Sequence, residues 1–378
     1  MKKKDLQVVS APHRGGAETM IMNVLRETNH DEIQYDFISH IPNKSDYDDE
    51  IASYGGSVIH IKSLGTTGII KYIRELIDVN KKYGPYDAVH CHTNLQAAVV
   101  MTAAKLCHIK IRISHSHNTN WGLENSLRNK LIVKAAIFLI KLFATEYLAC
   151  GDEAGISMYG KECFDSHKVV VIHNGIDLDK FAETGSYTKI RTLKRLELGI
   201  DNNCFVIGHI GRYHDQKNHE FIIEIGKALK KVEVKCKILL IGAGNKFDEI
   251  NKLIRDNKLE NEILQLGVRK DIPELYSTFD LFILPSKYEG LPLVMVEAQA
   301  SGRRCIVSDV ITKETDMGLG LIEYLPINQG VNSWVKAIIS SKEEPEKICS
   351  IEEIKKMISN RGYSSKQNAD IINSIYLS

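Results

Sequence analysis

The chain has 378 residues, more than one hydrophobic core usually supports, so we expect two domains. Its 49 basic and 48 acidic residues balance, which excludes the strong net field that recruits nucleic acid. No apolar run approaches the roughly 20 residues of a membrane-spanning helix, and the N-terminal apolar run is too short for a secretory signal. We therefore expect a cytoplasmic protein that can also bind peripherally to the inner face of the cell membrane.

Eight cysteines are scattered along the chain, and none forms a C-x-x-C pair. Several lie inside apolar runs, where a cysteine packs as a small hydrophobe. This usage predicts free thiols in a reducing compartment instead of disulfides or a zinc site.

Short β-rich runs alternate with helical patterns from one end of the chain to the other. The strand-like runs cover residues 6–10, 35–39, 57–61, 88–92, 111–117, 146–151 and 168–175, then 204–211, 236–244, 262–268, 281–286 and 304–309. Apolar positions at helical spacing fill 219–231 and 246–257. Strands that are apolar nearly throughout, with helices between them, indicate parallel sheets covered on both faces.

The alternation restarts near residue 203, after a charged helical stretch, so we place a boundary within 175–195. This pattern predicts an α/β protein with two doubly wound, Rossmann-like domains. We expect the first domain at 1–180 and the second at 190–360.

The unusual polar segments all follow predicted strands. They are "GGAE" at 15–18, "SHSHN" at 114–118, "GRYHDQKN" at 211–218 and "SKYEG" at 286–290. Ligands of doubly wound sheets bind outside the carboxyl ends of the strands. The agreement in position implies a binding site between the two domains.

The segment "EGLPLVMVEAQASG" at 289–302 places two glutamates in an otherwise apolar stretch. Pro292 suits the first position of a helix, and Gly290 permits a positive φ or close approach of a ligand. Glu289 then lies on the turn, where it can accept hydrogen bonds from sugar hydroxyls, and Glu297 lies on the helix, where it can bind a vicinal diol such as a ribose. The alternative is that Glu289 caps the helix and Glu297 lies on its exposed side.

At this point the sequence resembles a known family. The same segment matches the E-x7-E signature of retaining, nucleotide-sugar-dependent glycosyltransferases of family 4, which have the GT-B fold of two Rossmann-like domains across a cleft. "GGAETMIMNVL", "HNGIDLDKF", "IGRYHDQKNHEFII" and "LGVRKDIPELY" are similar to further family segments, so the resemblance covers the whole chain. Within the family, the sequence most resembles the branch that assembles capsular polysaccharides and exopolysaccharides. The family also implies a C-terminal helix, 361–378, that crosses back to the first domain.

The resemblance implies a role for particular residues in binding the nucleotide-sugar donor. It assigns the donor pyrophosphate to Arg212 and Lys217, which also stabilise the leaving phosphate, and it implies a catalytic role for Glu289. The implied donor-binding residues are Gly16, Arg212, Lys217, Val268, Glu289, Gly290, Leu291, Pro292 and Glu297. Two cations at the pyrophosphate stabilise the departing charge without a metal ion, so we expect neither a metal nor another cofactor. The alternative is that Arg212 and Lys217 are ordinary cations of a polar loop.

Histidines cluster in the first half, with "HCH" at 90–92 and "HSH" at 115–117. Residues i and i+2 of a strand share a face, so chelation is geometrically open, but no Cys or Asp completes a recognisable ligand pattern. The resemblance implies that one histidine on the acceptor side, His115 or His117, reaches the sugar. We favour His117 as a catalytic residue because it comes last in the strand. For either histidine, a purely structural role is the alternative.

Residues 127–143 form a basic amphipathic pattern. Lys130, Lys134 and Lys141 share a helical face opposite Leu131, Ala135, Phe138 and Leu142. Such a helix either packs on its own sheet or contacts an anionic membrane transiently. Packing is the commoner outcome.

Together these features predict a retaining glycosyltransferase that transfers a hexose or N-acetylhexosamine from a UDP-sugar to a lipid-linked saccharide acceptor. Two alternatives are a non-catalytic UDP-sugar-binding subunit and, less in keeping with the signature, a UDP-sugar epimerase.

Overall fold

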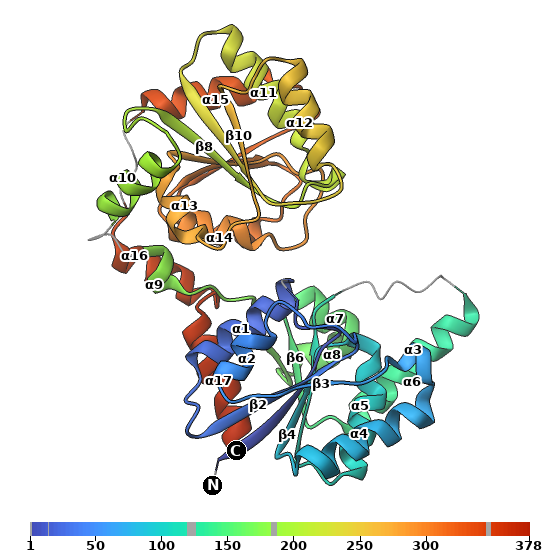
Figure 1. Cartoon of the computed structure of the whole chain (residues 1–378). Coiled ribbons are helices and arrows are strands. Elements are labelled where there is room, and N and C mark those ends of the chain that lie inside the picture. Colours follow the sequence, from blue (N-terminus) through green and yellow to red (C-terminus); the bar gives the residue numbers. More distant parts are fainter. Residues whose placement is uncertain (1, 14, 119–125, 183–186, 345–348) are drawn as a thin grey trace. The chain divides into compact units, whose positions relative to one another are not determined.

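The computed structural model describes residues 2–13, 15–118, 126–182, 187–344 and 349–378. The chain divides into two compact units (Figure 1). Unit 1 is Met1–Ile176 with Gly362–Ser378, and unit 2 is Asp177–Arg361.

Unit 1 is built on a parallel sheet in the order β3-β2-β1-β4-β5-β6-β7. Its strands are β1 (Lys3–Val8), β2 (Ile33–Ser39), β3 (Val58–His60), β4 (Ala88–Cys91), β5 (Ile111–Ser116), β6 (Glu146–Ala149) and β7 (Val169–Val171). Its helices are α1 (Gly16–Glu27), α2 (Asp48–Ser53), α3 (Leu64–Thr67), α4 (Ile69–Tyr83), α5 (Ala97–Leu106), α6 (Leu127–Phe143), α7 (Asp152–Tyr159), α8 (Lys161–Asp165) and α17 (Ser365–Leu377), with a 3-10 turn η1 (Asn94–Gln96). All seven strands predicted for the first half are therefore confirmed, within a few residues at their ends.

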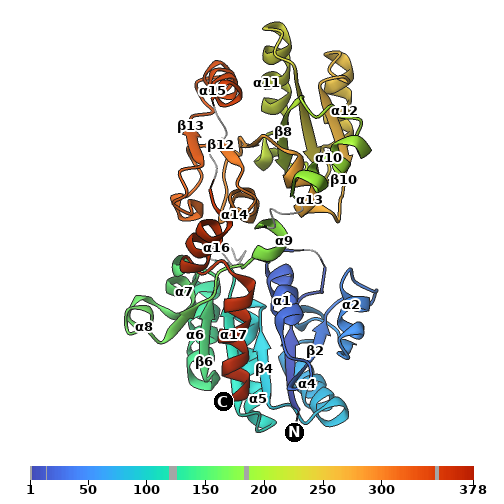
Figure 2. The same ribbon diagram turned by 90° about the vertical axis from the view of Figure 1, so that its left-hand side faces the viewer.

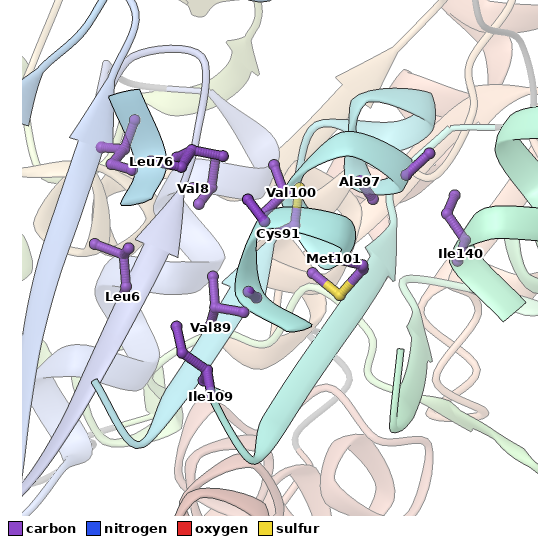
Figure 3. Packing of buried hydrophobic residues seen from close by; sticks show 14 of the residues in the cluster. Leu6, Val8, Leu76, Val89, Cys91, Ala97, Val100, Met101, Ile109 and Ile140 are labelled. Atoms are coloured by element: carbon purple, nitrogen blue, oxygen red, sulfur yellow. The ribbon is translucent and has the colours of Figure 1, made fainter. Parts of the chain in front are cut away.

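The alternation of side chains along β1 separates two layers. Leu6 and Val8 point into a core that includes Leu76, Val100 and Met101 of α4 and α5 (Figure 3). The alternate residues Asp5 and Gln7 point to the opposite face, where α1 and α17 pack. Buried polar side chains therefore lie beneath the C-terminal helix.

The C-terminal helix belongs to unit 1. At its start Ser365 N donates to Ile176 O (3.0 Å), and Ile176 N donates to Tyr363 O (2.8 Å), so the two connecting segments run side by side. A side chain at Gly175 would lie within 2.8 Å of the Ser365 backbone nitrogen, which explains the glycine. Helix α17 then packs on α1 and β1, and both termini lie in this unit (Figure 2).

Unit 2 has a second parallel sheet, in the order β10-β9-β8-β11-β12-β13. Its strands are β8 (Phe205–Ile210), β9 (Cys236–Ile241), β10 (Ile263–Gly267), β11 (Leu281–Leu284), β12 (Arg304–Ser308) and β13 (Ile322–Leu325). Its helices are α9 (Leu178–Ala182), α10 (Tyr187–Glu197), α11 (His219–Lys231), α12 (Phe247–Asp256), α13 (Ile272–Thr278), α14 (Leu293–Ala300), α15 (Asn332–Glu343) and α16 (Ile351–Asn360), with 3-10 turns η2 (Asp215–Lys217) and η3 (Lys313–Thr315). The sequence prediction missed β13, an edge strand that is only partly buried.

Helix α6 packs on unit 1, as expected, but through a different face from the one we predicted. Ile140 is its one fully buried residue within the described chain, and Ala136 and Phe143 pack beside it. Leu131 and Phe138, which were expected to pack, are 68% and 65% exposed. The helix therefore presents apolar side chains to solvent. Among the described residues, no helix is both long and apolar enough to cross a membrane.

All eight cysteines are described and are free thiols, as predicted; Cys91, Cys236 and Cys305 are buried, and the other five are half-buried.

Candidate active site

The predicted donor residues of unit 2 follow two neighbouring strands. The chain passes from β8 outward to β9 and β10, then returns to β11 beside β8 and continues outward to β12 and β13. The sheet therefore changes direction between β8 and β11, and the loops after these strands begin at a topological switch point. Arg212 and Lys217 lie in the first loop, and Glu289 lies in the second.

Glycines hold the loop after β8 against the loop after β9. Gly242 has a φ of 140°, and a side chain there would lie 2.1 Å from the Gly211 carbonyl oxygen. A side chain at Gly244 would lie 2.4 Å from the Tyr213 carbonyl oxygen, and Tyr213 N donates to Ala243 O (3.0 Å). The "IGAG" segment therefore has a packing role, which its sequence alone did not reveal.

Side chains then tie the loop after β8 to the loop after β11. Lys217 Nζ donates to Glu289 Oε1 (2.6 Å), and Gln216 Nε2 donates to Glu289 Oε2 (3.0 Å). The Lys217 and Glu289 side chains are only 14% and 6% exposed. Asn218, in the left-handed conformation before α11, donates from Nδ2 to Pro285 O (3.0 Å). The pair Lys217–Glu289 is thus fixed in place, and the lysine keeps further N–H donors for an anion.

Arg212 is exposed and has no hydrogen bond or ion pair within the described parts of the chain. The structure thus brings Lys217 and Glu289 into direct contact, and leaves the Arg212 guanidinium available for an anionic ligand. The pairing was not foreseen, because the sequence suggested separate ligands for the cation and the carboxylate. Gln216, the second partner of Glu289, was also missed; an amide next to the predicted lysine was the available signal.

The turn before α14 differs in detail from the prediction. The helix begins at Leu293, so Pro292 occupies the N-cap position and not the first helical position. Gly290 does not have a positive φ, so that reason for the glycine is wrong. A side chain at Gly290 would meet nothing within 4 Å, and the residue is exposed, so close approach of a ligand remains open. Leu291 is half-buried beside it.

Glu297 lies on α14 and contacts α13. Tyr276 OH lies 3.1 Å from Glu297 Oε2 and 2.9 Å from Val294 O. Loss of solvation raises the pKa of Glu297 to about 7, although the hydrogen bond from Tyr276 opposes the shift. The carboxyl therefore changes charge near neutral pH. The alternative that Glu297 belongs to the exposed side of the helix does not hold, because the residue is half-buried and its carboxylate is hydrogen-bonded to Tyr276. Tyr276, which orients it, was not identified from the sequence.

Val268 follows β10 and is 67% exposed. Its neighbour Arg269 forms ion pairs with Asp271 (2.6 Å) and Glu197 (3.0 Å). Val268 is thus exposed at the carboxyl edge of the sheet, while its neighbour Arg269 is held by ion pairs.

In unit 1, Gly16 is the first residue of α1. A side chain there would come no closer than 3.6 Å to Asn174 Nδ2, an ordinary contact, so packing does not explain this glycine.

The predicted histidines of unit 1 lie together at the ends of β4 and β5. His90 Nε2 lies 3.1 Å from His115 Nδ1, and His92 Nδ1 lies 2.8 Å from His117 Nε2. His115 is fully buried, whereas His117 is partly exposed, so His117 is the better placed of the two for a ligand.

Two doubly wound parallel sheets, with charged loops at a switch point, define an α/β protein of the class that binds nucleotides at strand ends. Family models agree: residues 14–180 match "Glycosyltransferase Family 4", and residues 204–340 match "Glycosyl transferases group 1". The chain belongs to this glycosyltransferase family.

Individual relatives cover most of the chain. A Bacillus subtilis (strain 168) protein named "Putative glycosyltransferase EpsF" is 36% identical over 99% of this chain and 96% of its own. An Escherichia coli UDP-Gal:alpha-D-GlcNAc-diphosphoundecaprenol alpha-1,3-galactosyltransferase is 31% identical over 71% of each chain. The Anabaena protein Alr3699/HepE, solved with UDP and glucose, covers all of both chains with a TM-score of 0.72 and 19% identity, a likeness of fold. The protein is thus a glycosyltransferase with the GT-B fold, as the resemblance at the E-x7-E segment predicted.

Proposed function

We propose that the protein transfers a hexose or N-acetylhexosamine from a UDP-sugar to a lipid-linked saccharide, with retention of anomeric configuration. The contact that carries the donor part of this proposal is the Lys217–Glu289 pair at the switch point, with Arg212 unpaired in the same loop. The relatives support the substrate classes: one galactosyltransferase is named for a UDP-sugar donor and a diphosphoundecaprenol acceptor.

Departure of UDP leaves negative charge on its β-phosphate. Arg212 and Lys217 would stabilise that charge as it develops, which needs no metal ion. Glu297 would accept hydrogen bonds from the ribose diol, and the Val268 backbone would contact the base. The open space at Gly290 would admit the sugar.

Retention is proposed to proceed by departure of UDP and entry of the acceptor on the same face. Both carboxylate oxygens of Glu289 already accept hydrogen bonds, from Lys217 and from Gln216, which makes this carboxylate a poor nucleophile. In the proposed step the bond from the anomeric carbon to the β-phosphate oxygen breaks. The acceptor oxygen bonds to that carbon, and its proton passes to the departing phosphate.

The test is release of UDP on incubation with a panel of UDP-sugars and a membrane extract, followed by NMR of the product's anomeric configuration. Glu289→Gln should reduce turnover strongly, whereas Glu262→Gln, which alters an ion-paired glutamate elsewhere in unit 2, should not. An inverted product would contradict retention. UDP binding without release would favour the non-catalytic subunit, and sugar interconversion without release would favour the epimerase.

Membrane contact through α6 is part of the same proposal. The described helix contains no acidic residue, and Lys130, Lys134 and Lys141 are exposed together with Leu131 and Phe138. Basic residues beside exposed apolar ones suit the surface of an anionic bilayer, where a lipid-linked acceptor is held.

Sedimentation with vesicles containing phosphatidylglycerol should show binding that Phe138→Ser weakens. Leu196→Ser, at an exposed leucine of unit 2, is the matched control. Equal binding by both variants would remove α6 from the proposal.

A further inference from the structure

The four histidines of unit 1 lie on one face of two adjacent strands. β4 pairs with β5 in parallel, and the side chains of His90, His92, His115 and His117 all project toward the layer that contains α17. Their rings stack, with centroids 4.1 Å apart for His90 and His92 and 4.2 Å apart for His115 and His117. Buried imidazole nitrogens are normally hydrogen-bonded, and in this set His115 Nε2 and His117 Nδ1 have no partner within the described residues.

Two residues outside the cluster supply hydrogen-bond partners. Gln7 of β1 places Oε1 2.7 Å from His92 Nε2. Its Nε2 donates to Asp5 Oδ2 and to Tyr376 OH (2.9 Å). Tyr376 OH lies 2.5 Å from His90 Nδ1. Tyr376 comes from α17, so the C-terminal helix completes this network.

These contacts determine which ring nitrogen carries the proton in His92 and in His117. A carboxamide oxygen only accepts hydrogen bonds, so His92 Nε2 carries the proton that meets Gln7. A neutral His92 then has a lone pair on Nδ1. The neighbouring His117 Nε2 must donate to it, which leaves a lone pair on His117 Nδ1.

His117 Nδ1 is buried and has no hydrogen-bond partner within the described residues. We propose that Gln7 and His92 are positioning residues that fix the tautomer of His117, so that its Nδ1 accepts a hydrogen bond from a sugar hydroxyl. The identity of the ligand as a sugar rests on the proposed transferase function. The assignment of the His117 tautomer does not depend on that function.

The electrostatics of the cluster agree with neutral rings. Burial lowers the pKa of His117 to about 4, and burial with mutual repulsion lowers the pKa of His90, His92 and His115 well below the ordinary value. At neutral pH each ring therefore has one donor nitrogen and one acceptor nitrogen, as the chain of hydrogen bonds requires.

A metal ion is the competing explanation of such a cluster. One nitrogen from each of His90, His92 and His115 can be chosen so that all three lie within 4.8 Å of one another. Both ring nitrogens of His90 and both of His92 already have protein partners, which a metal ion would have to displace. The hydrogen-bonded arrangement is favoured, and a metal is an outcome that the test must detect.

The first test is direct observation of the tautomer by long-range ¹H–¹⁵N correlation NMR of the full chain labelled with ¹⁵N-histidine. His117→Gln assigns the signal. We expect His117 in the Nε2–H form with an unprotonated Nδ1, and we expect Gln7→Leu to change that signal. Gln34→Leu, at a glutamine on the adjacent strand β2, should leave it unchanged.

A His117 signal in the Nδ1–H form would overturn the proposal, and the wild-type spectrum decides this even where a variant does not fold. A spectrum of Gln7→Leu identical to that of wild type would also overturn it. Removal of a bound metal by a chelator, with movement of the His90, His92 and His115 signals, would replace the proposal with a metal site.

The second test is kinetic. In UDP release with a membrane extract, Gln7→Leu should lower kcat about tenfold, the effect of roughly one hydrogen bond, with little change in the donor KM. Tyr376→Phe should lower kcat less, because Tyr376 acts through Gln7. Tyr86→Phe, at a buried tyrosine whose hydroxyl donates to Asp36, is the control. If wild type releases no UDP, the proposed function fails while the NMR result stands. If wild type is active and Gln7→Leu is unaffected, only the positioning role fails.

Discussion

Binding of a ribose to unit 2 should strengthen as pH rises through 7, because of Glu297. Its carboxyl accepts hydrogen bonds from a diol best when it is ionised. Its pKa is raised to about 7, so about one tenth of the molecules are ionised at pH 6 and about nine tenths at pH 8. The dissociation constant for a diol that binds only the ionised form should therefore fall about tenfold over this interval.

Uridine is the appropriate probe, because it has the ribose diol and lacks the phosphate groups of UDP, which titrate in the same range. Its affinity is measured by NMR titration at pH 6, 7 and 8. Glu297→Gln should bind weakly with no pH dependence, and 2′,3′-dideoxyuridine should show none with wild type. A uridine affinity in wild type that changes by less than about twofold would refute the reasoning.

Three further predictions follow from the same residues. The folded-state pKa of Glu297 is raised above its ordinary 4.5, so its contribution to stability is largest below pH 4.5 and is lost as pH rises through 7. In urea unfolding, the free energy of unfolding of Glu297→Gln should therefore rise relative to that of wild type by up to roughly 3 kcal/mol between pH 4.5 and 8. A difference between the two proteins that stays constant with pH would contradict this. Gly242→Ala should cost about 2 kcal/mol of unfolding free energy, since it places a methyl group against the Gly211 carbonyl at an unfavourable φ, and unchanged stability in thermal unfolding would be incompatible with that contact. Turnover should survive EDTA, because Arg212 and Lys217 supply the positive charge; loss of activity that Mg²⁺ restores would contradict their role.

The strands and the family were predictable because both depend on local patterns. Runs such as 281–284 and 305–307 are apolar throughout, and that pattern identifies buried parallel strands without knowledge of their neighbours. The edge strand Ile322–Leu325 was missed because it is only partly buried and so lacks a continuous apolar run.

The partners within the site were not predictable, because they depend on strand order. Only the adjacency of β8 and β11 brings Lys217 to Glu289. Likewise, Gln7 and Tyr376 are separated by 369 residues, and they meet because α17 returns to the first sheet. The prediction of the packed face of α6 was also wrong. Two faces of that helix carry apolar residues, and only the tertiary contacts distinguish them.

The central claim is that the loops at the switch point of unit 2 bind the diphosphate of a nucleotide sugar. The most direct measurement is the affinity of UDP for wild type, Arg212→Ala and Arg255→Ala by titration calorimetry, since Arg255 is an exposed arginine on α12. Loss of a charged hydrogen bond to phosphate predicts UDP binding about tenfold to a hundredfold weaker in Arg212→Ala and unchanged in Arg255→Ala. Equal affinity in all three proteins would contradict the account.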